Sequence, residues 1–178
     1  MPAFPGSLEL RDGDLELRRL LPTDREAILL ACQDPEIPRW TDLPDPFTSE
    51  SALALLDDAA RAWYDGTVAE LAIVADGRMV GATHLAFYSD WRASVAYWLA
   101  PEARGRGYVT RAVRLVTRWG FDTFESLNRI ELWSIVGNEA SDAVARRAGF
   151  TEEGVLRSRF PARGEYKDVR CFSLLRED

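Results

Sequence analysis

The sequence has few residues of the kinds that form metal sites or disulfide frameworks. Cysteine occurs only at Cys32 and Cys171, and the one histidine is His84. Two cysteines are too few for a disulfide framework, and the three residues lack the spacing of a zinc-ligand motif. We therefore expect no structural metal.

The chain also lacks positive charge and long apolar runs. Its 22 Lys and Arg residues against 29 Asp and Glu residues give a net charge of -7, which argues against nucleic acid or an anionic membrane as a partner. No run of about eighteen apolar residues occurs, and residues 1–20 have no basic segment leading into an apolar stretch. We expect a cytoplasmic protein.

Length and composition predict one domain over residues 1–178. With 178 residues, 47% hydrophobic and 29% charged, the chain is long enough for one substantial core and too short for two domains.

The first third of the chain carries a hairpin signal and two helix signals. Alternating apolar residues on both sides of Asp12-Gly13 predict a hairpin of two short strands. Thr23 and Glu26 form a capping-box pattern that predicts the start of a helix. Residues 34–48 contain four prolines and no sustained period, so we predict a loop there, followed by a second helix.

From residue 68 the apolar period changes to two. Residues 68–76, 78–88 and 93–100 predict three consecutive antiparallel strands, and helical spacing returns after residue 108. Residues 128–135 predict another strand, residues 138–150 a short helix closing at Gly149, and residues 165–177 a final strand. We therefore predict an α+β fold with about seven strands and about four helices around one sheet.

The segment PEARGRGYVTRA, residues 101–112, joins the third of these strands to a helix. A strand that enters a glycine-rich loop at a helix start leaves backbone N–H groups unpaired, and the helix dipole reinforces their positive field. Such a loop suits a bound anion, and Arg104 and Arg106 add positive charge. The alternative is a tight turn with solvated arginines.

Three phosphate-binding patterns compete for this loop. The Walker pattern is excluded because residues 105–110 contain no lysine, and the dinucleotide fingerprint has Thr110 in place of its third glycine. Residues 104–109 resemble the acyl-coenzyme A loop of the GCN5-related N-acetyltransferases. That loop has Gln or Arg, two residues, a glycine, one residue, and a glycine or alanine. Val109 departs from the last position, where a β-branched side chain would crowd the diphosphate.

The resemblance extends over residues 15–175. Residues 17–44 and 129–157 resemble the ribosomal-protein acetyltransferase-like branch of the superfamily, including Asn138, Ser141 and the pair Gly149-Phe150. The resemblance implies a mixed, mostly antiparallel sheet that splays open at its centre and binds acetyl-CoA in the split. The residues that it implies for cofactor binding are Trp98, Leu99, Arg104, Gly105, Arg106, Gly107, Tyr108, Val109, Thr110, Asn138 and Ser141.

Direct attack of an amine on a thioester requires a base and a donor for the departing sulfur. Glu131 is our first candidate for the base, acting through a water, although it is equally well explained as a solvated strand carboxylate. His84 is the second candidate, although a lone histidine in an apolar strand is more often simply packed.

Many members of the superfamily carry a tyrosine acid seven residues after the asparagine that corresponds to Asn138, and here that position is Ala145. The resemblance therefore gives the donor role to Ser141, or leaves the thiolate to solvent. Asn138 and Ser141 also suit a helix start, where they have a purely structural explanation.

The sequence indicates the identity of the acceptor amine less closely than it indicates the reaction. Trp40, His84 and Trp133 are our candidates for contact with it, and the carboxylates of residues 34–48 suit a cationic amine. A protein N-terminus and a small amine both remain open. A non-catalytic acyl-CoA-binding regulatory module is the alternative from another class, and release of free thiol distinguishes the two. Relatives are often dimers, so a homodimer is a further possibility.

Overall fold

The protein is described by a computed structural model that covers residues 4–178, so residues 1–3 of the predicted 1–178 domain lie outside the described residues. Its eight strands form one sheet in the order β1-β2-β3-β4-β5-β6-β8-β7. The strands are β1 (Glu9–Asp12), β2 (Leu15–Arg19), β3 (Val68–Ala75), β4 (Arg78–Phe87), β5 (Arg92–Leu99), β6 (Arg129–Ile135), β7 (Thr151–Ala162) and β8 (Glu165–Leu175). The helices are α1 (Arg25–Ala31), α2 (Glu36–Trp40), α3 (Ser49–Tyr64), α4 (Tyr108–Thr123) and α5 (Glu139–Ala148).

The sheet is open at its centre. Every neighbouring pair of strands is antiparallel except β5 and β6, which run parallel and pair only from Arg92↔Arg129 to Val95↔Leu132. Beyond Val95 the two strands diverge, so the second half of β5 has no partner on that side. The predicted α+β fold and its central splay are confirmed.

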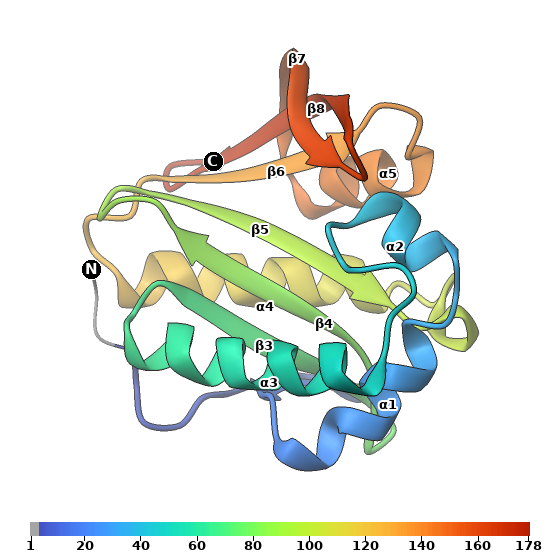
Figure 1. The fold of residues 1–178 in the computed structure, drawn as a ribbon. Helices are drawn as coiled ribbons and strands as arrows, with labels where there is room; N and C mark the ends of the chain where they lie inside the picture. The colour runs from blue at the N-terminus through green and yellow to red at the C-terminus, as the bar shows by residue number, and fades with distance from the viewer. Residues whose placement is uncertain (1–3) are drawn as a thin grey trace.

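The helices cover the two faces of the sheet. In Figure 1, α1, α2 and α3 lie in front of the sheet and α4 lies behind it. We call these the front and back faces. The larger core cluster includes the buried face of α4, with Ala112, Val113 and Val116, and a second cluster joins α1 and α3 to Ala82 and Trp98. In residues 4–178 no helix is both long and apolar enough to cross a membrane.

The N-terminal hairpin is confirmed. Asp12 pairs with Leu15, so the turn consists of Gly13 and Asp14, and Gly13 takes the positive φ of 58° that the turn requires.

The start of α1 differs from the predicted capping box. Pro22 begins a 3₁₀ turn that contains Thr23, and no side chain caps α1 itself. The backbone N–H of Leu21 donates to Asp24 at 2.8 Å, and Arg18 holds the same carboxylate through two hydrogen bonds of 2.8 Å. The predicted capping box of Thr23 and Glu26 was wrong, because the tighter proline-initiated turn makes Asp24 the N-cap residue of α1.

The segment predicted as a loop contains the short helix α2. Asp34 accepts a hydrogen bond from the Glu36 N–H at 3.2 Å, and Pro35 and Pro38 lie at the helix start. Prolines are tolerated in a first turn, where their missing N–H groups would have no helical partner. Pro35 and Pro38 therefore do not prevent this helix, which ends at Trp40 after five residues.

Strand β7 was not among the predicted strands, which raises the observed number from seven to eight. Ten of its twelve positions are exposed, and its sequence does not alternate between apolar and polar residues, which is the signal that predicts a half-buried strand. Its pairing with β8 across the turn at Arg163 and Gly164 makes it a strand.

Candidate active site

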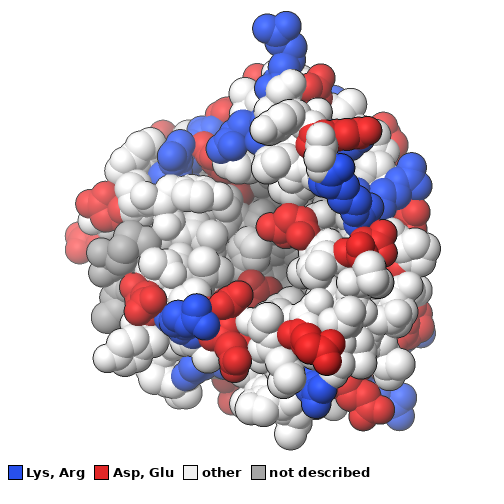
Figure 2. All heavy atoms as spheres, viewed as in Figure 1, with Lys and Arg blue, Asp and Glu red and all other residues white. Residues whose placement is uncertain are grey.

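A cavity of about 1260 Å³ opens at the split between β5 and β6. Residues from α2, α3, β3, β4 and β7 line its front side, and residues from the glycine-rich loop, α4 and α5 line its back. Figure 2 shows the hollow in this face of the molecule, with acidic side chains gathered around it. The split in the sheet therefore brings residues of both faces into one cavity.

Alternation along β5 assigns its residues to the two faces. Ala96 pairs with His84 of β4 and shares the front face with Trp98, whereas Tyr97 between them is directed to the back. All four of these residues line the cavity. Polar groups on the front and back faces of the sheet, on either side of β5, therefore line the same cavity.

The front face carries a histidine paired with a carboxylate. His84 Nδ1 lies 3.1 Å from Glu70 Oε2, and the exposed fractions of the two side chains are 31% and 17%. Burial disfavours the charged imidazole, but the nearby Glu70 carboxylate and the more distant Asp42 favour it, and the pKa of His84 is raised. The pair can hold a proton at the cavity wall.

Four carboxylates line the front side of the cavity. They are Glu36 of α2, Asp42 of the following loop, Asp58 of α3 and Glu70 of β3. Of the acids at or near this mouth, Glu36 lies 3.0 Å from Arg39 and Asp58 lies 3.3 Å from Arg61. Asp34 pairs with Arg104, and Asp45 lies 3.7 Å from Arg163. In residues 4–178 Asp42 forms no ion pair with a lysine or arginine. The front mouth favours a cation.

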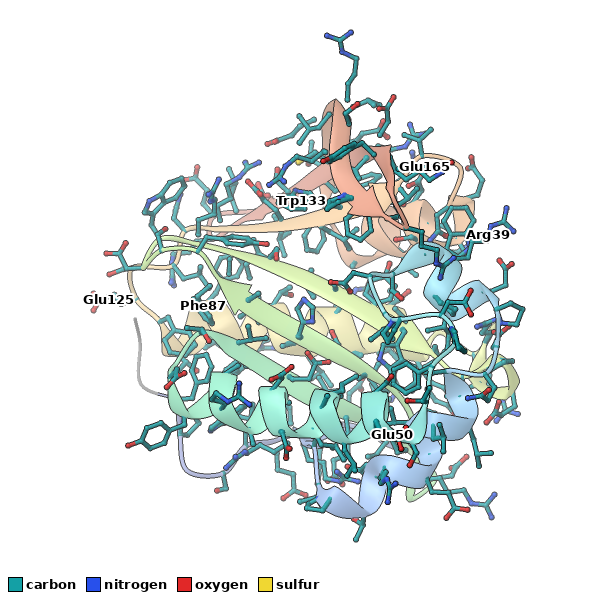
Figure 3. The ribbon with its side chains drawn as sticks, in the orientation of Figure 1. Arg39, Glu50, Phe87, Glu125, Trp133 and Glu165 are labelled. Carbon is teal, nitrogen blue, oxygen red and sulfur yellow. The ribbon has the colours of Figure 1, made fainter. Side chains whose placement is uncertain are left out.

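Aromatic side chains form the upper wall of the same side. Trp133 of β6 is stacked on Tyr88 with ring centroids 6.1 Å apart, and the Arg159 guanidinium lies 4.1 Å from the Trp133 ring. Figure 3 shows Trp133 beneath the β7–β8 hairpin, whose tip carries Glu165. Trp40 donates a hydrogen bond to Glu36 at 3.0 Å. Both predicted tryptophans, Trp40 and Trp133, line the cavity.

The back face carries neutral hydroxyl groups at the start of α5. Asn138 is the N-cap residue, and its Oδ1 accepts from the Ser141 N–H at 3.1 Å. The Ser141 hydroxyl lies 2.9 Å from the Tyr97 hydroxyl, which reaches it from β5. Asn138 therefore has the structural role expected of a cap and also presents Ser141 to the cavity.

The glycine-rich loop has the geometry of an anion site. Gly105 and Gly107 both adopt a φ of 77°, and a Cβ at either position would meet no protein atom within 4 Å. Gly107 is the N-cap of α4 and provides no side-chain cap, so the first amides of the helix are left for another partner. The glycines are needed for backbone conformation, and the space beside them is open.

The loop arginines differ in their surroundings. Arg104 forms an ion pair with Asp34 and donates to the Leu99 carbonyl at 3.2 Å, which ties the loop to the segment before α2. Arg106 is exposed and is absent from the cavity lining. The backbone amides and the dipole of α4 are therefore the main positive features of the loop within the cavity.

Residues 14–151 match the family model of the acetyltransferase (GNAT) domain. The chain belongs to the GNAT acetyltransferase family. It is therefore an acyltransferase, which favours the predicted enzyme over a non-catalytic acyl-CoA-binding module.

Relatives and solved structures agree with this membership. Over 170 residues the chain is 29% identical to the "Putative ribosomal N-acetyltransferase YdaF" of Bacillus subtilis, covering 92% of each sequence. A crystal structure described as "Probable acetyltransferase" is 28% identical, with a TM-score of 0.86 and coverage of 96% of this chain and 98% of that one. The apo RimL ribosomal L7/L12 α-N-protein acetyltransferase, 22% identical, has the same fold, with a TM-score of 0.85 and coverage of 95% and 94%. The resemblance to the ribosomal-protein acetyltransferase-like branch is confirmed.

The cavity of this GNAT domain brings together all the predicted site residues except Arg106 and Glu131. The Glu131 side chain is 9% exposed and accepts a hydrogen bond from Arg129 at 2.9 Å, with Arg92 3.9 Å away. It lies on β6 opposite Ser94, where the sheet is still closed. The structure therefore gives Glu131 an ion-paired setting rather than one open to the acceptor.

Val109 is 9% exposed and packs in the core with Val113. Its side chain is therefore largely occupied by protein contacts, although the residue also borders the cavity beside Tyr108 and Thr110. This burial reduces the space that Val109 takes from a ligand on the loop.

Sequence reasoning missed Glu70, Tyr88 and Tyr97 as site residues. Alternation in residues 93–100 was enough to place Tyr97 on the opposite face from Trp98. No local signal identified its partner, because Ser141 lies on a different element after the split.

Proposed function

We propose that this protein transfers an acetyl group from acetyl-CoA to a primary amine by direct attack in a ternary complex, and that the acceptor is the N-terminal amine of a protein. The observation that carries the proposal is the single cavity through the split sheet. It has the His84–Glu70 pair on its front side and Ser141 with the glycine-rich loop on its back side.

The cavity has suitable features for acetyl-CoA. The free amides at Gly107 and the open space beside Gly105 fit a diphosphate. Hydrogen bonds to a charged group contribute about 1.5–3 kcal/mol each, so a few of them outweigh the unfavourable net charge. The second half of β5, at Trp98 and Leu99, has no strand partner toward β6 and can pair with the amides of a pantetheine chain.

The front side is suited to an amine. An N-terminal ammonium group approaches Asp42 and Glu70 favourably, while Arg39 and Arg61 partly offset the charges of Glu36 and Asp58. Trp133 borders this side with its ring already contacted by Arg159. The 29% identical relative named a ribosomal N-acetyltransferase supports an amine of a ribosomal protein as the acceptor. The same carboxylates favour a small polyamine as the second candidate acceptor.

His84 is the residue that we assign as general base. Its Nδ1 is engaged by Glu70, so a neutral imidazole that donates from Nδ1 has its lone pair on Nε2, available to the acceptor amine. The Glu70 carboxylate stabilises the imidazolium that forms. Because the pKa of His84 is raised, the neutral base becomes the main form only at a higher pH than for an ordinary histidine.

Ser141 is the residue that we assign as donor to the departing sulfur. Its hydroxyl borders the cavity on the back face, and its backbone is held by Asn138. Ser141→Ala should lower the turnover number with little change in acetyl-CoA affinity. An unchanged turnover number would remove Ser141 from the mechanism.

Calorimetric titration with acetyl-CoA and with free coenzyme A is the first test. We expect one-to-one binding of both ligands, followed by thiol release when an acceptor is added. Peptides with a free N-terminus, the same peptides with a blocked N-terminus, and spermidine then distinguish the acceptor classes. No binding at millimolar ligand would overturn the proposal, and release with spermidine alone would select the second acceptor class.

A further inference from the structure

Tyr97 is the one residue of β5 that connects the two sides of the split through a side-chain hydrogen bond to α5 in residues 4–178. It lies two residues beyond Val95, the last position at which β5 pairs with β6. Its hydroxyl lies 2.9 Å from Ser141 Oγ and 3.4 Å from the Ser141 carbonyl oxygen. The contact therefore joins the open half of β5 to the first turn of the helix that follows β6.

Ala145, seven residues after Asn138, is the position where the resemblance to the superfamily implies a tyrosine acid, and it is fully buried in the core. A phenol nevertheless reaches the start of α5, because Tyr97 approaches it from the neighbouring strand. We infer that Tyr97 is a positioning residue that donates a hydrogen bond to Ser141 Oγ and so directs the Ser141 hydroxyl proton toward the departing sulfur. This inference rests on the proposed function.

The phenol has one proton, and of its two possible acceptors Ser141 Oγ at 2.9 Å lies nearer than the Ser141 carbonyl oxygen at 3.4 Å. A phenol is a far stronger acid than an aliphatic hydroxyl, so the phenol is the better donor and the serine oxygen the better acceptor. Burial raises the pKa of Tyr97, and the hydrogen bond to Ser141 only partly opposes this effect. The phenol is consequently protonated throughout the working range and is always able to donate.

The consequence for Ser141 is geometric. Once its oxygen accepts from Tyr97, its own proton points away from the phenol, and the side chain borders the cavity. Without the phenol, the serine hydroxyl rotates freely among its staggered positions and loses this bias.

The transfer step balances without any change in Tyr97. The ammonium group first releases one proton to solvent through His84. The amine nitrogen then forms a bond to the carbonyl carbon and loses a second proton to His84, and the C–S bond breaks with its electron pair remaining on sulfur. Ser141 stabilises the developing thiolate by hydrogen bonding, the sulfur takes one proton from solvent, and His84 returns one to solvent. Tyr97 keeps its proton and acts only through the orientation of Ser141.

A double-mutant cycle tests this role. Thiol-release kinetics are measured for wild type, Tyr97→Phe, Ser141→Ala and the double variant, with thermal unfolding of each. We expect Tyr97→Phe to lower kcat about three- to tenfold, the scale of one hydrogen bond, while KM for acetyl-CoA changes less than about twofold. The double variant should have the kcat of Ser141→Ala alone, because Tyr97 acts through Ser141.

Several outcomes would overturn the inference. An unchanged kcat in Tyr97→Phe shows that Tyr97 does not act through Ser141. A double variant whose fold-loss of kcat equals the product of the two single losses shows the same. A loss in KM rather than kcat shows a role in cofactor binding. Absence of turnover in wild type defeats the proposed function itself, and the two failures are thereby distinguished.

Tyr88 provides the matched control. Its hydroxyl lies 3.0 Å from Ser94 Oγ in the same cavity, a similar tyrosine–serine contact at the front face. In the double variant, the fold-change in kcat caused by Tyr88→Phe should multiply with the fold-change caused by Ser141→Ala. The low-pH limb of the rate profile should stay in place in Tyr97→Phe, since the base His84 lies on β4, on the opposite face of the sheet.

Discussion

Two polar pairs lie on opposite faces of the sheet and differ in how they are built. The His84–Glu70 pair joins β3 and β4, which are neighbours along the chain and in the sheet. The Tyr97–Ser141 pair joins β5 to α5 across the open part of the split. The first pair is charged and titratable, and the second is neutral.

The difference shows how one cavity can serve two halves of an acyl transfer. Taking a proton from an ammonium group requires a base whose charge changes near neutral pH, and the closed half of the sheet holds it rigidly. Stabilising a departing thiolate requires a donor that is always protonated, and Tyr97 and Ser141 supply neutral hydroxyl groups. Substitutions at each face should therefore change different kinetic parameters.

The largest effect is expected at the front face. His84→Gln removes the base while keeping an amide of similar size, and we expect kcat/KM for the amine to fall about 100- to 1000-fold. Calorimetry should show unchanged affinity for acetyl-CoA. If Glu131→Gln causes this loss and His84→Gln does not, the base is Glu131 as the sequence first indicated.

The next effect concerns the back face. Gly107→Val introduces a β-branched side chain at a φ of 77° and into the open space beside the loop. We expect acetyl-CoA affinity to fall about 100-fold, the equivalent of one or two lost hydrogen bonds to charge. Gly77→Val is the matched control, because Gly77 has a φ of 73°, equally open surroundings and a remote turn. Retained affinity in Gly107→Val would refute the anion-site interpretation of the loop.

The strand between the two faces is sensitive to one glycine on β4. A Cβ on Gly81 would lie 2.4 Å from the Trp98 carbonyl oxygen. Gly81→Ala must therefore displace β5, and we expect a loss of about 1–3 kcal/mol in the free energy of unfolding. Denaturant unfolding measures it, with Gly6→Ala as the control because a Cβ on Gly6 meets nothing within 4 Å. Equal stability of the two variants would contradict the close approach.

The subtlest effect is a shift in pH dependence. Glu70 raises the pKa of His84, so Glu70→Gln should lower it. The neutral base then appears at lower pH, and the rising limb of kcat/KM against pH should move in that direction. Asp58→Asn is the control, because Asp58 lines the cavity but does not contribute to this shift. A limb that stays in place in Glu70→Gln would show that His84 does not govern it.

Local patterns predicted the elements that carry the site. The hairpin at Gly13, the three-strand meander and the glycine-rich loop follow from turn chemistry and from alternation, which involve only neighbouring residues. Strand β7 was not predicted because its exposed side chains show no alternation. The capping box at Thr23 was wrong because Pro22 imposed a tighter turn.

The candidate base shows the limit of alternation. Alternation places Glu131 on one face of β6, but it does not reveal that Arg129 binds the carboxylate at the closed end of the split. A pattern identifies a face of a strand, and only the packed structure shows which charges meet there.

The sequence by itself determined the order of the elements other than α2 and β7, the helix start at Gly107 and the likeness to a family of acetyltransferases, since each rests on contiguous residues. Only the tertiary structure decided which side chains of the site pair with each other. A two-residue turn after Ala75 would place Glu70 opposite Thr83, but the register shift near Val74 brings it opposite His84. Tyr97 meets Ser141 only because β5 and β6 separate beyond Val95. Both pairings depend on strand register and on the opening of the sheet, which arise from packing over the whole domain.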